Sequence, residues 1–282
     1  MRTVGVSAKL HDARAESLAR ELIDWLRRQG REVLVDDTVP GFGDAPLADM
    51  PERVGLMVVL GGDGTLLHVA RRFIGHDTPI LGINLGRLGF LTEAAAGSML
   101  EVVEQVLAGR AKIKTHFSLK AQAWRDGQAL ESGFAINDVV LQRNDHPRMI
   151  EFEMYVYGHF VFRLRADGLV LATPAGSTAY ALSAGGPIVH PEVAAISVVP
   201  ICPHVLSNRP VVLPASASIE LVLTESPAPA ALNLDGQVHH ELCAGDRIQV
   251  DRADTVSLAY LPERHYFEVL RSKLLWAGHA QE

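Results

Sequence analysis

The chain has 282 residues, of which 48% are hydrophobic and 21% charged, and it carries a formal net charge of −7. This composition is that of an ordinary globular protein, and the length is comfortable for two domains. The negative charge argues against a general nucleic-acid or membrane-surface binder, which needs a basic face, and no apolar stretch reaches the ~18 residues of a membrane span. Two cysteines without Cys-x-x-Cys spacing, and no signal-peptide pattern, predict a cytoplasmic protein.

Strands and amphipathic helices alternate along the first 110 residues. The pattern predicts strands at 2–7, 31–35, 56–60 and 79–84, and helices at 13–29, 65–74 and 98–107. The stretch 36–51 is rich in Pro, Gly and Asp and is expected to be a surface loop. This alternation predicts a Rossmann-like α/β domain over 1–110, built on a parallel sheet. Ligands collect at the carboxyl ends of such strands, where Asp63 and Asn84 are expected to lie.

After residue 110 the pattern changes to period two. Strands are expected at 113–124, 132–142, 150–157, 159–164, 196–200, 218–223, 230–234 and 247–257. Tyr157-Gly158-His159 predicts a hairpin turn between two of them. These regularly spaced strands predict a β-sandwich-like domain over 111–261. A helical pattern at 265–276 predicts that the segment 262–282 returns to pack on the first domain.

The motif Gly61-Gly62-Asp63-Gly64-Thr65 lies between the strand at 56–60 and the helix that follows. Glycines leave room for a ligand against the backbone, and a helix start offers N–H groups and partial positive charge to a phosphate. Asp63 can then orient a hydroxyl or hold a metal near that phosphate. The alternative is structural: Asp63 or Thr65 caps the helix and the glycines only make a tight turn. The motif is neither Walker A nor Gly-x-Gly-x-x-Gly.

Two further segments interrupt the apolar strands. Asn137-Asp138 is either a bulge or strand end, or a carboxylate–amide pair aimed at a ligand. In the segment 165–187, small residues permit a flat ligand to approach, Tyr180 can lie against an aromatic ring, and Arg165 and Asp167 can flank it. Capping by Ser177 and Thr178 is the structural alternative. Asp235-Gly236-Gln237 predicts a hairpin turn.

Four histidines and one cysteine are candidates for metal binding or catalysis. The spacing of His190, His204, His239 and His240 is not that of metal ligands. Cys202 and His204 are too close in sequence to face each other productively, so no thiol nucleophile is expected. The sequence therefore predicts no metal site made by side chains.

Taken together, these segments resemble the bacterial NAD kinase family, which phosphorylates NAD to NADP. The resemblance runs over most of the chain, and the long block 173–187 is its most specific part. The other matching segments are, in order, 61–65, 84–91, 137–138, 200–204, 207–210, 235–237 and 267–271.

The resemblance implies roles for individual residues. Asp63 would accept the proton of the adenosine ribose 2′-hydroxyl. The residues implied to bind NAD are Asp63, Gly64, Asn137, Asp138, Arg148, Arg165, Asp167, Thr178, Ala179, Tyr180, Ala181, Leu182, Ser183 and Gln237. The resemblance also places His68 among the NAD-binding residues, at a position where the residue type varies within the family. The turn residues Gly61, Gly62, Gly64 and Thr65 would hold phosphates of ATP together with a divalent cation, Mg²⁺ or Mn²⁺.

The family also implies a homo-oligomer, a dimer or a tetramer, built through the β domain. Two other functions share part of the pattern. A lipid kinase of the diacylglycerol or sphingosine type has a similar glycine turn, but it leaves 173–187 and 207–210 unexplained. A non-catalytic NAD-binding sensor explains the binding residues, but binding alone does not need the Asp63 carboxylate.

Overall fold

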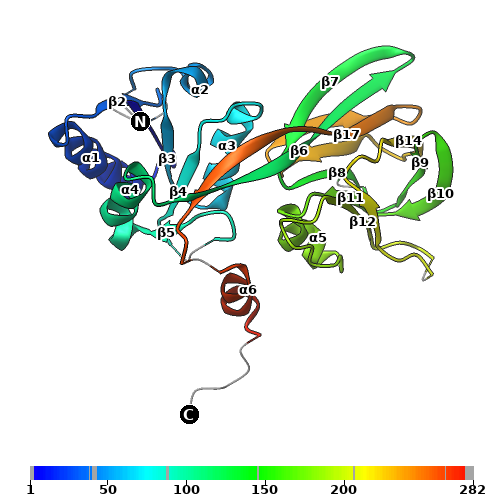
Figure 1. Cartoon of the computed structure of the whole chain (residues 1–282). Helices are drawn as coiled ribbons and strands as arrows, with labels where there is room; N and C mark the ends of the chain where they lie inside the picture. The colour runs from blue at the N-terminus through cyan, green and yellow to red at the C-terminus, as the bar shows by residue number, and fades with distance from the viewer. Residues whose placement is uncertain are drawn as a thin grey trace. The chain divides into compact units, whose positions relative to one another are not determined.

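The computed structural model describes residues 3–37, 39, 43–86, 89–144, 146–205, 207–263 and 265–276. The chain forms two compact units (Figure 1). Unit 1 consists of Met1–Thr115 and Val256–Glu282, and unit 2 of His116–Thr255. Two long strands, β6 (Lys112–Arg125) and β17 (Arg247–Tyr260), contribute residues to both units.

Unit 1 contains a parallel sheet in the order β2-β1-β3-β4. Its strands are β1 (Thr3–Ala8), β2 (Glu32–Val35), β3 (Leu56–Leu60) and β4 (Ile80–Asn84). The short β5 (Ala94–Ala95) and the last residues of β17 also pair with β4 in parallel. Residues of β3 and β4 are buried throughout, as expected when both faces of a sheet are covered. The predicted α/β domain with a parallel sheet is thereby confirmed.

Helices cover both faces of this sheet. The helices are α1 (Ala13–Arg28), α2 (Met50–Arg53), α3 (Asp63–Ala70), α4 (Met99–Leu107) and α6 (Tyr266–Leu274). α1 and α4 share one apolar cluster with β1 and β3. Leu66 of α3 instead lies against Gly82 of β4. Of the expected loop 36–51, residues 38 and 40–42 lie outside the described residues. In the described part, the buried Asp36 and Ala45 form an isolated β-bridge, and a 3₁₀ turn (Leu47–Asp49) leads into α2.

Unit 2 consists of two largely antiparallel sheets. Within unit 2 the first has the order β10-β9-β14-β17-β6-β7 and the second the order β13-β12-β11-β8-β15-β16. Besides β6 and β17, the two sheets contain the strands β7 (Gln128–Ala135), β8 (Asp138–Arg143), β9 (Ile150–Val156), β10 (His159–Ala166), β11 (Gly168–Ala172), β12 (Ala195–Ile201), β13 (Val211–Pro214), β14 (Ile219–Glu225), β15 (Ala230–Leu234) and β16 (Val238–Leu242). Alternate residues of both sheets, including Phe152 and Leu141, meet in one buried core. The predicted β-sandwich-like architecture is confirmed.

One predicted strand, 132–142, is wrong. The chain makes two strands there, and they belong to different sheets: β7 pairs with β6, whereas β8 pairs with β11 and β15. The backbone N–H groups of Ile136, Asn137 and Asp138 are bound by the Asp235 carboxylate, so the ladder is interrupted between β7 and β8. Strands β13 and β16 were not predicted.

The predicted hairpin turn at Tyr157-Gly158 is confirmed. Both residues have positive φ, 51° and 76°, and Val156 pairs with His159. Positive φ at both central residues is the geometry of the two-residue turn whose twist matches that of the strands. In the described part of the chain, no helix has the length and apolar character needed to cross a membrane.

Candidate functional site

The glycine turn of unit 1 connects β3 to α3. The Gly61 N–H donates to the Ile83 carbonyl at 2.9 Å, and a Cβ at position 61 would lie 2.4 Å from Thr65 Oγ1. α3 begins at Asp63, and its N-cap is Gly62, without a side-chain cap. The capping interpretation of Asp63 and Thr65 is therefore wrong. A Cβ at Gly62 would meet no atom of the described residues within 4 Å, so they leave space for a ligand beside this backbone.

The Asp63 carboxylate faces the backbone of residues 90–92. Oδ2 accepts a hydrogen bond from the Phe90 N–H at 2.7 Å. Oδ1 accepts bonds from the Leu91 N–H at 3.2 Å, the Thr92 N–H at 3.1 Å and Thr92 Oγ1 at 3.2 Å. A Cβ at Gly89 would lie 1.9 Å from Oδ1, so only glycine permits this approach. Asp63 thus has a fixed orientation, while Oδ2 accepts a single bond from the described residues.

Thr92 joins Asp63 to Asn84, and the sequence analysis did not identify it. Its buried hydroxyl accepts bonds from Asn84 Nδ2 at 3.0 Å and from the Gly89 N–H at 2.9 Å. Asp63 and Asn84 therefore lie together at the carboxyl ends of β3 and β4, as predicted. Residues 87 and 88 of the segment 84–91 lie outside the described residues.

His68 lies on α3, one turn beyond Asp63. Partial burial is the main cause that lowers the pKa of His68, and the positive charges of Arg71 and Arg72 lower it further. The imidazole is therefore biased toward its neutral form at neutral pH.

In unit 2, a hollow of about 320 Å³ brings together four of the predicted residues: Asn137, Asp138, Ala179 and Tyr180. Its other lining residues are Val140, Gln142, Asn233, Asp235, Gly236 and His239. Tyr180 is 42% exposed and lines the hollow. The approach of a flat ligand to this segment stays a prediction.

Strand alternation explains why these side chains share one face. Val139 and Leu141 of β8 point into the sandwich core, so Asp138, Val140 and Gln142 point to the opposite face. Asn233 on the neighbouring strand β15 faces the same way. Gln142 could have been found from this period-two pattern. His239 and Asn233, which are hydrogen-bonded to each other, required the pairing of β15 with β16.

The peptide groups 136–138 are held from two sides. Asp235 Oδ1 accepts from the N–H groups of Asn137 at 2.7 Å and Asp138 at 3.2 Å, and Oδ2 from that of Ile136 at 3.0 Å. The Thr173 hydroxyl donates to the Ile136 carbonyl at 2.6 Å, and the backbone N–H of Thr173 donates to the Asn137 carbonyl at 2.9 Å. Asn137 and Asp138 are therefore at the fixed start of a strand, which confirms the strand-end interpretation, while their contact with a ligand stays a prediction.

The Asp138 carboxyl group is 5% exposed. Burial raises the pKa of Asp138 to about 7, and the negative charge of Asp235 contributes to the increase. A carboxyl group with this pKa is partly protonated at neutral pH, and in that form it can donate a hydrogen bond to a ligand.

A second hollow, of about 610 Å³, shares Gln142 and Tyr180 with the first. Its remaining lining residues are Arg143, Asn144, Pro147, Asp167 and Ile201. Asp167 was predicted, but its partner was not: Arg143 Nε donates to Asp167 Oδ1 at 2.6 Å, and Arg143 Nη1 donates to the His146 carbonyl at 2.6 Å. Arg143 therefore ties the loop after β8 to the bend between β10 and β11.

Other predicted residues lie outside the linings of these two hollows. Arg148, Arg165 and Gln237 are exposed on the loop before β9, on β10 and at the end of the turn after β15. The segment 178–183 forms the end of a 3₁₀ turn and the short helix α5 (Tyr180–Ser183). Neither element has a side-chain cap, so the capping interpretation of Ser177 and Thr178 is wrong.

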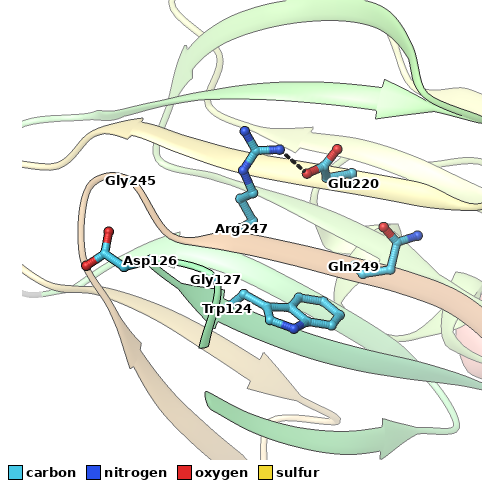
Figure 2. Close-up of a pocket in the computed structure, with 7 residues that line it drawn as sticks. All are labelled: Trp124, Asp126, Gly127, Glu220, Gly245, Arg247 and Gln249. Carbon is cyan, nitrogen blue, oxygen red and sulfur yellow. Dashed lines mark hydrogen bonds and ion pairs between the residues drawn. The ribbon is translucent and has the colours of Figure 1, made fainter. Parts of the chain in front are cut away.

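A third hollow, of about 390 Å³, contains none of the predicted residues. Figure 2 shows its lining, which comes from the β6–β7 turn, β14 and β17, with Arg247 donating to Glu220 at 2.7 Å. In the part of the chain that the structure describes, no three His, Cys, Asp or Glu side chains are grouped to hold a metal ion.

Comparison with known protein families gives matches over both units. The ATP-NAD kinase N-terminal domain matches residues 4–111, and the ATP-NAD kinase C-terminal domain matches residues 136–260. The NAD kinase of Magnetococcus marinus is 40% identical over 286 residues, which cover 98% of this chain and 94% of that protein. The NAD kinase of Thiobacillus denitrificans is 42% identical and covers 97% of each chain.

Two solved structures are similar over nearly the whole chain. Yeast NADH kinase complexed with NADH has a TM-score of 0.87 and 30% identity, covering 100% of this chain and 89% of that one. An NAD kinase from Archaeoglobus fulgidus in complex with ATP has a TM-score of 0.76 and 25% identity, covering 97% and 98%.

Proposed function

This chain belongs to the ATP-NAD kinase family and is a kinase that acts on NAD, and we propose that Asp63 is the residue that activates the accepting hydroxyl. The reaction transfers the γ-phosphoryl group of ATP to the 2′-hydroxyl of the adenosine ribose and gives NADP. Both alternatives, the lipid kinase and the non-catalytic sensor, lack support, since the matching families and relatives are NAD kinases.

One observation carries the proposed role of Asp63. Oδ1 takes three hydrogen bonds from the loop 91–92, whereas Oδ2 takes only the one from Phe90 among the described residues. A carboxylate oxygen has two lone-pair sites, so Oδ2 can accept one further bond, from a substrate hydroxyl. As the 2′-oxygen bonds to the γ-phosphorus and the bond to ADP breaks, the hydroxyl proton passes to Asp63.

The dinucleotide is proposed to bind at the hollows of unit 2. Asn137, Asp138 and Tyr180 supply an amide, a carboxyl group and a partly exposed aromatic ring there. Such a combination suits a ribose and a planar base, through hydrogen bonds and ring stacking. Ala179 lines the same hollow, and Asp167, held by Arg143, lines the second hollow, which shares Tyr180 with the first. Arg148, Arg165, Gln237 and the remaining residues of 178–183 are kept as proposed NAD contacts on the family resemblance alone.

The phosphates of ATP are proposed to lie against the glycine turn. The N–H groups at the start of α3 and the space that the described residues leave beside Gly62 suit an anionic group. Because the described residues offer no side-chain metal cluster, a divalent cation, Mg²⁺ or Mn²⁺, would enter with the phosphates of ATP. When bound, such an ion neutralises charge on the phosphoryl oxygens.

The test is a comparison of two variants in an assay of NADP formation from NAD, ATP and Mg²⁺. Asp63→Asn should lower kcat by roughly 10²–10⁴-fold, the range of a general base, while calorimetry still detects NAD binding. EDTA should abolish the wild-type reaction, and added Mg²⁺ should restore it.

Thr92→Val separates catalysis from anchoring. This variant removes the hydroxyl that bonds Asp63 and Asn84 but leaves the Asp63 carboxylate. It should lower the melting temperature while retaining kcat within about tenfold, since the base and its N–H donors are still present. If both variants lose turnover equally, Asp63 acts only as an anchor of residues 90–92 and the proposed role is refuted.

We also propose that the enzyme is cytoplasmic and forms a homo-oligomer. Free Cys202 and Cys243 are consistent with a reducing compartment. Phe160 and Val161, 57% and 45% exposed on β10, offer apolar surface for association of subunits. Light scattering after size exclusion gives the mass in solution and tests the oligomer.

A further inference from the structure

We propose that Asp235 is a positioning residue for NAD: its carboxylate holds the peptide groups 136–138 so that Asn137 and Asp138 face the hollow before the dinucleotide arrives. This inference rests on the proposed function of the hollow. It assigns Asp235 a role beyond the hairpin turn in which the chain places it.

The contacts of Asp235 are those of a backbone clamp. The single carboxylate accepts hydrogen bonds from the N–H groups of Ile136, Asn137 and Asp138, which precede Asp235 by 99, 98 and 97 positions in the chain. The Asp235 N–H in turn donates to the Asp138 carbonyl at 3.0 Å, so the two segments bind each other in both directions. Hydrogen bonds to a charged group are stronger than neutral ones, and three of them fix this bend firmly.

A turn alone does not need this carboxylate. Asp235 and Gly236 have φ of 52° and 63°, and the same Asp-Gly pair with φ of 51° and 78° forms the turn at Asp126-Gly127. Asp126 lies at the rim of the third hollow, and its carboxylate accepts no hydrogen bond from a described residue (Figure 2). Both turns place Asp-Gly at positive φ, although Leu234 pairs with Val238 across three loop residues and Arg125 pairs with Gln128 across two. An Asp-Gly hairpin turn therefore forms without such bonds, and the three N–H bonds belong to the turn beside Asn137 and Asp138.

The Asp235 side chain lines the same hollow as the residues that it holds. The titratable groups around that hollow are Asp138, Tyr180, His239 and Asp235 itself. Its negative charge acts on the buried Asp138 carboxyl group and raises the pKa of that group, in addition to the effect of burial. Asp235 thus influences both the position and the protonation of the ligand-facing side chain.

The test is Asp235→Asn, with Asp126→Asn as the matched control. Asparagine is tolerated at positive φ, so both turns should persist. Asp235→Asn should raise KM for NAD about tenfold, the effect of ~1.4 kcal/mol, and weaken NAD binding in calorimetry to the same extent. KM for ATP should change less than about twofold, and Asp126→Asn should leave both values unchanged.

The pH dependence gives a readout that a loosened turn would not change. Removing the charge at position 235 lowers the pKa of Asp138, so the midpoint for KM of NAD against pH should move to lower pH in Asp235→Asn. His239 and Tyr180 remain in the variant, so the shift is assigned to Asp138. An unchanged KM for NAD, or a raised KM with an unmoved midpoint, overturns the positioning role.

A measurement on the unmodified enzyme covers the case in which Asp235→Asn does not fold. Hydrogen exchange should show the amides of Ile136, Asn137 and Asp138 already protected without NAD. If they exchange freely and become protected only with NAD, the inference is wrong. If the wild-type enzyme forms no NADP at all, the proposed function fails instead, whatever the amides show.

Discussion

The buried carboxyl group of Asp138 should make the stability of unit 2 depend on pH in an unusual direction. An ordinary aspartate has a pKa of 3.8, whereas that of Asp138 is raised to about 7 by burial and by the Asp235 charge. The unfolded chain therefore releases its proton at lower pH than the folded chain does. Between these two pKa values, increasing pH favours the unfolded state, so stability falls as pH rises.

The size of this effect follows from the two pKa values. At about 1.4 kcal/mol for each pH unit, the ionised Asp138 costs on the order of 4 kcal/mol of folding free energy above about pH 7. Roughly 2–3 kcal/mol of this develops between about pH 5 and about pH 8. Asp138→Asn has the shape of the protonated acid and no proton to lose. We therefore expect the free energy of unfolding of the variant, relative to that of the wild type, to increase as pH rises.

Urea unfolding at a series of pH values measures this difference. Subtracting wild type from variant at each pH cancels the contribution of the groups that titrate elsewhere. If the Asp138→Asn difference is constant with pH, or if the variant loses stability at high pH, the reasoning about burial is refuted.

Two glycine substitutions test the turn beside Asp63. Gly89→Ala places a Cβ 1.9 Å from Asp63 Oδ1 and should cost roughly 1–3 kcal/mol of stability together with most of the turnover; normal thermal unfolding and normal NADP formation would contradict this. The Cβ of Gly62→Ala meets no atom of a residue that the structure describes, so this variant should change stability by no more than about 1 kcal/mol yet raise KM for ATP several-fold. An unchanged KM for ATP would place the phosphates elsewhere.

Local patterns in the sequence were enough for much of the fold. The alternation of helices with buried strands predicted the parallel sheet of unit 1, and period two predicted the sandwich of unit 2. The turn at Tyr157-Gly158 was predicted correctly, because positive φ at adjacent residues is a local property. Asp63 and Asn84 were placed at neighbouring strand ends for a similar reason, since parallel strands end at one edge.

The sequence by itself thus determined the two architectures and the glycine turn, and it proposed the segments of the candidate site. The tertiary structure decided what each polar side chain binds. Asp63 does not cap its helix but holds residues 90–92. Asp235 binds the backbone of Ile136, nearly a hundred residues away, and so interrupts the strand predicted at 132–142. Arg143 and Thr92 entered the site only through partners distant in the chain. Helix and strand periodicity arises from neighbours in sequence, whereas a carboxylate selects its N–H donors among all groups that folding brings within hydrogen-bond distance.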